Sequence, residues 1–155
     1  MMNSVEHIRR QLKEKQLHRL HAMEPGRKLD VLIATYVMKY VVEKITIDNI
    51  EDYWYRKNPI YAVNQQHELE RVPNYSTVIF SAFQLLDLYP DWNMTKKDGK
   101  YSVQLADQKV PNDEVKSTHI EIIPIYTDLA EAICKSCLQY VIYNNKMIEE
   151  LIESS

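Results

Sequence analysis

Apolar residues recur at helical spacing in four stretches of the chain. The spacing predicts a first helix over about Asn3–Met23, ended by a Pro-Gly pair, and a second over about Arg27–Glu43. A third helix is expected to begin with Ser76 as its N-cap, because a serine hydroxyl can accept from the first free amides. The residues that follow Ser76 are apolar on nearly every side, which favours this as the most buried helix.

The last helix is predicted from Asp128 to about Glu153, with Asp128 and Glu131 at the spacing of a capping box. Alternating apolar residues and turn signals predict the strands. In chain order these are Tyr53–Arg56 and Ile60–Val63 around Asn58-Pro59, Asp91–Lys97 and Lys100–Ala106 around Asp98-Gly99, and His119–Ile123. The order of elements indicates an α+β protein, a layered α/β/α sandwich with a mainly antiparallel sheet of about four or five strands and about four helices.

Length and charge favour one domain with a distinct N-terminal helix. The chain has 155 residues, the usual size of one domain, and we divide it into a basic amphipathic helix over 1–26 and a single α+β domain over 27–155. The net charge is -3, yet residues 1–28 hold seven Lys and Arg against three acids. Such asymmetry is typical of a basic arm or of a helix that docks on an acidic partner.

Glycine and cysteine usage exclude several classes. The two glycines, Gly26 and Gly99, are too far apart for a phosphate loop, a dinucleotide fingerprint or a nucleophile elbow. No window approaches the roughly 20 apolar residues of a membrane span, and no secretory h-region opens the chain. With only two cysteines, the cytoplasm is the expected compartment, that of the host cell if a phage encodes the chain.

Cys134 and Cys137 form a CxxC, a spacing found in redox pairs and in half of a zinc site. A zinc site needs four ligands, and no second CxxC or histidine pair at metal spacing exists. No nearby cysteine or pair of acids completes a set with His18 and His21. The pair also lies inside a predicted helix rather than at its N-terminus, where a thiol pKa would be lowered. Buried, unreactive cysteines are the better interpretation, and we expect no metal, no cofactor and no catalytic residue.

Aromatic residues beside cations give the main candidate binding site. Tyr53, Trp54, Tyr55 and Arg56 could stack on a base and neutralise phosphate, although the same residues also suit an ordinary strand. The tripeptide Tyr75-Ser76-Thr77 offers hydroxyls and free amides to an anion, although helix capping alone explains Ser76. These seven residues are our candidate ligand-binding set.

Three segments carry a resemblance to a known family. They are Leu29–Ala34 with Val37-Met38, then Tyr75-Ser76-Thr77 with Ala82-Phe83, and Ala130–Cys134 with Leu138. Their order and spacing resemble the phage ABA-sandwich domain family, small proteins of bacteriophages and prophages. The chain departs from the family pattern at Lys39, where a glycine is usual, at Phe83, where tryptophan is usual, and at Val78, where an acid is common. The resemblance implies a layered sandwich and a phage origin, and it implies no activity.

The leading hypothesis is a phage or prophage accessory protein that acts by binding a host protein or a small nucleotide. Sequestering a nucleotide signal of host immunity, an anti-defence role, is one version of it. A nucleic-acid-binding protein that uses the basic first helix is the first alternative. A small nucleotide-processing enzyme that uses Asp30, Glu121 and Asp128 is the second. Apolar residues on the first and last helices also allow a homo-oligomer.

Overall fold

The computed structural model describes residues 4–56, 69–106, 125–144 and 146–152. It confirms the α+β class, with four α-helices and antiparallel strands. The helical elements are α1 (Ser4–Ala22), α2 (Arg27–Leu32), the π-helical turn η1 (Ile33–Val37), α3 (Ile79–Leu86), α4 (Leu129–Tyr143) and the 3₁₀ turn η4 (Glu149–Leu151). Within the described ranges, no helix is long and apolar enough to cross a membrane.

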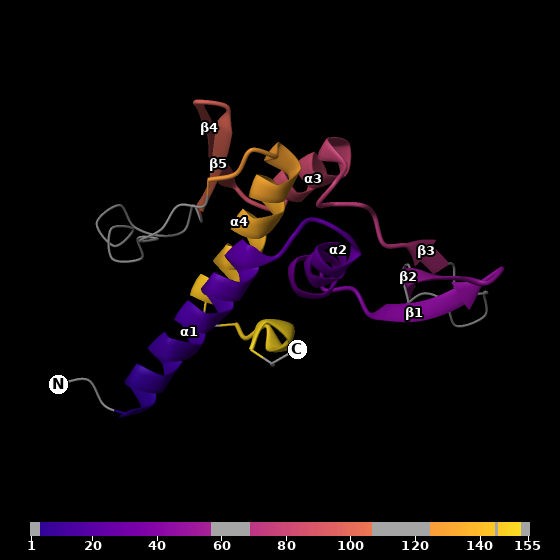
Figure 1. Cartoon of the computed structure of the whole chain (residues 1–155), viewed down its shortest axis with the longest axis horizontal. Helices are drawn as coiled ribbons and strands as arrows, with labels where there is room; N and C mark the ends of the chain where they lie inside the picture. Colours follow the sequence, from indigo (N-terminus) through magenta and orange to yellow (C-terminus); the bar gives the residue numbers. More distant parts are fainter. Residues whose placement is uncertain (1–3, 57–68, 107–124, 145, 153–155) are drawn as a thin grey trace.

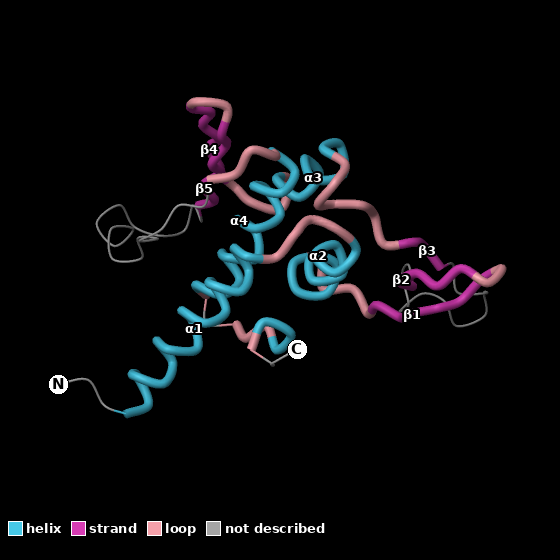
Figure 2. The backbone as a smooth tube through the Cα atoms, viewed as in Figure 1, coloured by secondary structure: helices cyan, strands magenta, loops and turns pink. Residues whose placement is uncertain are grey.

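The five described strands lie in two antiparallel sheets. One has the order β1 (Val42–Ile47), β2 (Ile50–Arg56), β3 (Leu69–Arg71), and the other pairs β4 (Asp91–Lys97) with β5 (Lys100–Ala106). The two sheets lie at opposite ends of the helical body (Figures 1 and 2). The predicted strands Ile60–Val63 and His119–Ile123 lie outside the described residues.

Helix α4 is the centre of the molecule. It contacts α1, α3, η1 and β5, and its residues from Ala132 to Gln139 are all buried. Even Lys135 is 1% exposed, because its ammonium donates to Glu131 at 2.6 Å and to the carbonyl of His21 at 3.1 Å. A buried charge needs such partners. The burial of α4 therefore depends on polar contacts to its neighbours as well as on its apolar residues.

Helix α3 is not the most buried helix, so that prediction is wrong. Ala82, Leu85 and Leu86 pack inward, while Phe80 is 73% exposed and Phe83 is 43% exposed. The helix contacts α4 along one face, and its remaining apolar side chains are exposed. Composition cannot reveal how many faces of a helix have neighbours, because that number is set by tertiary packing.

The second predicted helix ends early. Helical structure stops at Val37, and Lys39 then adopts a left-handed conformation with φ 61°. Lys39 occupies the position where the resembled family has glycine, the residue that adopts positive φ without strain. Residues 42–43, predicted as helix, belong to β1, whose β-branched residues favour a strand.

Of the two described β-hairpin turns, the second along the chain agrees with the prediction and the first was not predicted. Asp98 and Gly99 take φ 54° and 73°, and the hairpin β4–β5 has the predicted bounds. Asp48 and Asn49 take φ 53° and 66° and join β1 to β2, a hairpin that was not predicted. Both turns need positive φ at two successive residues, which Asp, Asn and Gly tolerate best.

The last helix starts as predicted and ends about ten residues early. The Asp128 carboxylate accepts from the amide of Ala130 at 3.0 Å, which confirms it as the N-cap. Helix α4 ends at Tyr143, and the amide of Lys146 donates back to the Val141 carbonyl at 3.2 Å. The chain then continues to η4, which contacts α1.

Candidate functional site

Asp30 forms the centre of a buried polar node, which we define as Gly26, Asp30 and Ser76. The Asp30 side chain is fully buried, and its Oδ1 accepts from both the amide and the hydroxyl of Ser76 at 2.7 Å. The amide of Gly26 donates to the Ser76 hydroxyl oxygen at 2.9 Å. The α3 helix begins at Ile79, so the prediction of Ser76 as its N-cap is wrong. Its hydroxyl instead ties α2 to the segment before α3.

Arg27 covers the buried polar node from outside. Its Nη1 lies 3.1 Å from Oδ2 of Asp30 and donates to Oδ1 of Asn74 at 2.9 Å. Its Nε donates to Oδ1 of Asp52 at 3.0 Å. Arg71 pairs with the other oxygen of Asp52. Burial opposes the charge of Asp52, but hydrogen bonds from Arg71, the Tyr53 amide and Arg27 outweigh it and lower the pKa of this carboxyl.

Two of the three segments that carry the family resemblance therefore meet in this node, through Asp30 and Ser76. The third segment lies on α4, which packs against η1 at the end of the first segment. Most residues of the pattern that carries the resemblance are therefore interior, although Phe83 and Thr77 are exposed. Buried polar groups with every partner in place stabilise a fold and leave few atoms for a ligand.

The candidate residues on β2 differ in burial, from the buried Tyr55 to the exposed Arg56. Tyr55 is buried, stacks on Tyr40 with ring centroids 4.0 Å apart, and donates to Glu70 at 2.5 Å. Burial and that hydrogen bond raise the pKa of Tyr55. Arg56 is exposed, and its Nε lies 3.8 Å from Oε1 of Glu43 on the neighbouring strand.

Tyr53 and Trp54 are half-buried on the same strand. The Lys44 ammonium lies 5.8 Å from the centre of the Tyr53 ring. The indole nitrogen of Trp54 is buried and has no hydrogen-bond partner among the described residues. Tyr55 and Tyr75 are both buried, and Tyr75 adds a smaller contribution to the raised pKa of Tyr55, after burial and the Glu70 hydrogen bond. Thr77 lies apart from them on the surface.

Both cysteines are buried and free, in agreement with the core interpretation. Burial raises the pKa of Cys137 to about 12, although the Tyr89 hydroxyl donates to its sulfur and opposes the shift. No group of three or more His, Cys, Asp or Glu within the described ranges could hold a metal ion. His21 is engaged with the Tyr126 hydroxyl at 3.0 Å.

The two described acids of the predicted enzyme alternative do not share a surface site. Asp30 belongs to the buried polar node and Asp128 caps α4. Glu121 lies outside the described residues. Both described acids therefore have structural partners.

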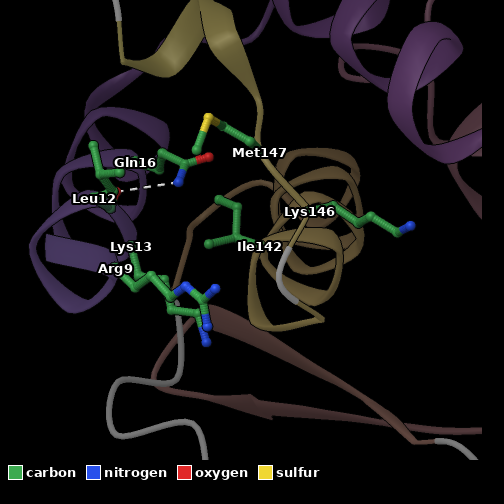
Figure 3. Close-up of a pocket in the computed structure, with 7 residues that line it drawn as sticks. All are labelled: Arg9, Leu12, Lys13, Gln16, Ile142, Lys146 and Met147. Carbon is green, nitrogen blue, oxygen red and sulfur yellow. Dashed lines mark hydrogen bonds between the residues drawn. The ribbon is translucent and has the colours of Figure 1, made fainter. Parts of the chain in front are cut away.

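A cleft between α1 and the segment after α4 is the candidate binding site. Its volume is about 260 Å³, and α1 contributes Arg9, Leu12, Lys13 and Gln16 to its lining. Ile142, Lys146 and Met147 line the opposite side. We call this the basic cleft, because it has three cations and no acid in its lining (Figure 3).

Gln16 holds the two sides of the basic cleft together. It is 2% exposed, its Nε2 donates to the Leu12 carbonyl at 3.1 Å, and its Oε1 accepts from the Ile148 amide at 2.9 Å. A glutamine bonded at both ends of its amide is fixed in position. The cleft is therefore built by a contact between residues 132 positions apart.

The cations of the basic cleft have no acidic partner among the residues that the structure describes. Arg9 and Lys13 lie one turn apart on α1 and extend along the same side of the cleft in Figure 3, while the Lys146 ammonium points away. Over the ranges that the structure describes, none of the three forms an ion pair. Sequence reasoning identified the basic helix but could not pair it with residues 142–147.

No protein-family model matches the sequence, and no curated protein matches it either. Among solved structures, the fold is similar to a phage protein from Bacillus cereus ATCC 14579, with a TM-score of 0.46 and 24% sequence identity. The match covers 76% of this chain and 91% of that chain.

Proposed function

We propose that this chain is a phage or prophage accessory protein that acts by binding, and that its ligand occupies the basic cleft. The observation that carries the binding role is the pair Arg9 and Lys13. Both lie at the mouth of the basic cleft, beside its apolar side chains, and neither forms an ion pair within the described part of the chain. Unpaired cations beside apolar surface suit a ligand that is both anionic and apolar. The phage origin rests on the residue pattern around Asp30, Ser76 and Ala130–Cys134.

The test is thermal stability of the purified protein against anionic ligands, namely mono-, di- and cyclic nucleotides, oligonucleotides and acidic peptides. A ligand present at 100 times its Kd and bound only to the folded state stabilises by about 2.7 kcal/mol, a clear rise in Tm. The rise should be lost in the double variant Arg9→Gln/Lys13→Gln. A ligand whose effect is unchanged in that variant binds elsewhere, and steady turnover of any nucleotide would contradict a binding role.

Nucleic-acid binding through α1 is the second candidate, favoured by one observation. The N-terminal part of α1 extends beyond the helical body (Figure 1), and Arg9, Arg10 and Lys15 are exposed on it. Such binding would weaken steeply with salt, because cations that contact phosphates release counterions. The double variant Arg10→Gln/Lys15→Gln would then weaken oligonucleotide binding as much as Arg9→Gln/Lys13→Gln. Binding that is insensitive to salt would exclude this candidate.

A further inference from the structure

We infer that the basic cleft and the exposed N-terminal part of α1 together form a groove for an acidic, aliphatic helical segment of a partner protein. This inference rests on the proposed binding function and names the class of partner. Three observations support it: an apolar strip, cations beside that strip with no ion pair to any described residue, and the kinds of side chain in the lining.

The apolar strip runs along one face of α1 into the cleft. Val5 is 55% exposed and Ile8 is 53% exposed, and Leu12 continues their spacing into the cleft lining. Positions separated by three and four residues lie on the same side of a helix. Met147, 52% exposed, lies on the other wall of the cleft beside Leu12, and the fully buried Ile142 forms its floor. Exposed apolar residues that form a continuous strip, rather than scattered ones, mark an interaction surface.

The cations give the groove its charge preference. Arg9 and Lys13 lie beside the strip and supply this preference, because the ammonium of Lys146 on the opposite wall points away from the cleft. Glu6 is one turn before Arg9 on the same helix and reduces the local charge without removing its sign. A partner with acids beside its apolar face would complement these cations and be steered toward them.

The lining favours a peptide over a nucleotide. Bases are held mainly by stacking on aromatic rings, and none of the described residues that line the basic cleft is aromatic. Leu12, Ile142 and Met147 are aliphatic, and methionine adapts its shape to varied apolar side chains. The volume of about 260 Å³ is also below the roughly 300–1,000 Å³ of most small-molecule pockets. An amphipathic helix laid along a groove needs only a shallow cleft for its anchoring side chains.

The experiment uses the full chain and fluorescein-labelled peptides of about 14 residues, a common helix length. Each peptide carries leucines at helical spacing flanked by glutamates, and a scrambled peptide of the same composition is the control. Fluorescence anisotropy should show binding of the patterned peptides and at least about 10-fold weaker binding to Arg9→Gln/Lys13→Gln. Ile8→Ala, which removes exposed apolar surface only, should also weaken binding by several-fold.

The matched control variant is Arg10→Gln/Lys15→Gln, which removes the same charge from α1 residues outside the cleft lining. It should change peptide affinity by less than about two-fold, since screened rim charges contribute little. Equal loss in both double variants would overturn the groove. If no patterned peptide binds while an oligonucleotide binds through Arg9 and Lys13, the partner class is wrong and the binding role stands. If neither binds and no nucleotide does, the proposed function itself fails.

Discussion

The buried polar node and the basic cleft use charged side chains in opposite ways. In the node, Asp30 is fully buried and its carboxylate is engaged by Ser76 and Arg27. In the cleft, Arg9 and Lys13 reach solvent beside apolar residues and form no ion pair within the described ranges. A residue that the fold needs is expected to be costly to change, whereas a residue kept for a partner is expected to be replaceable without loss of stability. Each prediction below tests one side of this comparison.

The largest effect is expected from Asp30→Ala. Removing the carboxylate leaves the Ser76 amide, and part of Arg27, without a buried partner, which should cost about 3–5 kcal/mol of unfolding free energy. Urea unfolding followed by circular dichroism measures this cost. The control is Asp87→Ala, an exposed acid, which should stay within about 0.5 kcal/mol of the parent. A small cost for Asp30→Ala would remove the node as a stabilising feature.

Alkaline pH should destabilise the protein through the buried thiols. Cys137 has its pKa raised to about 12, so the native state keeps a proton that the unfolded chain releases above its ordinary pKa near 9. The associated stability is complete below pH 9 and falls by about 1.4 kcal/mol per pH unit as pH rises toward 12. Urea midpoints between pH 8 and about 11 measure this slope. Cys137→Ala should flatten it, and an unchanged slope would contradict the assignment.

The next effect is expected from Ser76→Ala, which removes the hydroxyl from the buried polar node. Asp30 would lose a 2.7 Å hydrogen bond and the Gly26 amide would lose its acceptor, at a cost of about 1–3 kcal/mol. The neighbouring Thr77→Ala, an exposed position, should change stability by less than about 0.5 kcal/mol. Similar values for both variants would mean that the Ser76 contacts contribute nothing measurable.

Lys39 sharpens the comparison, because it is an exposed cation whose backbone, not its charge, matters. A non-glycine residue at φ 61° is strained by about 1–2 kcal/mol. Glycine removes this strain, but its greater conformational freedom in the unfolded chain offsets part of the gain in stability. Lys39→Gly should therefore raise the unfolding free energy by up to about 1 kcal/mol. Lys39→Ala keeps the strain and should leave stability nearly unchanged. Destabilisation by Lys39→Gly would show that φ is not the constraint at this position.

The smallest effect on stability is expected from Arg9→Gln/Lys13→Gln. Neither cation has an acidic partner in the described part of the chain, so the unfolding free energy should change by less than about 0.5 kcal/mol and Tm should shift only slightly. Differential scanning calorimetry measures this directly. A marked fall in Tm would make these cations structural and would weaken the case for a ligand in the basic cleft.

The sequence by itself determined the elements whose signals are local. The Pro-Gly pair after Met23, the Asp98-Gly99 turn and the Asp128 cap each act within a few residues, and α1, the β4–β5 hairpin and the start of α4 lie where they were predicted. The α+β class follows from the order of such elements. The interior position of the two cysteines also follows from the apolar stripe of the last helix.

Tertiary structure decided everything that depends on neighbours distant along the chain. Ser76 looks like a helix cap in the sequence, but Asp30 and Gly26 compete for the same hydroxyl from about 50 positions away and determine its role. The apolar residues of α3 look buried, yet only one face of that helix has a neighbour. The basic cleft exists because Gln16 joins the first helix to Ile148, a contact across 132 positions. Local patterns carry no information on such pairings, since they arise only when the chain folds back on itself.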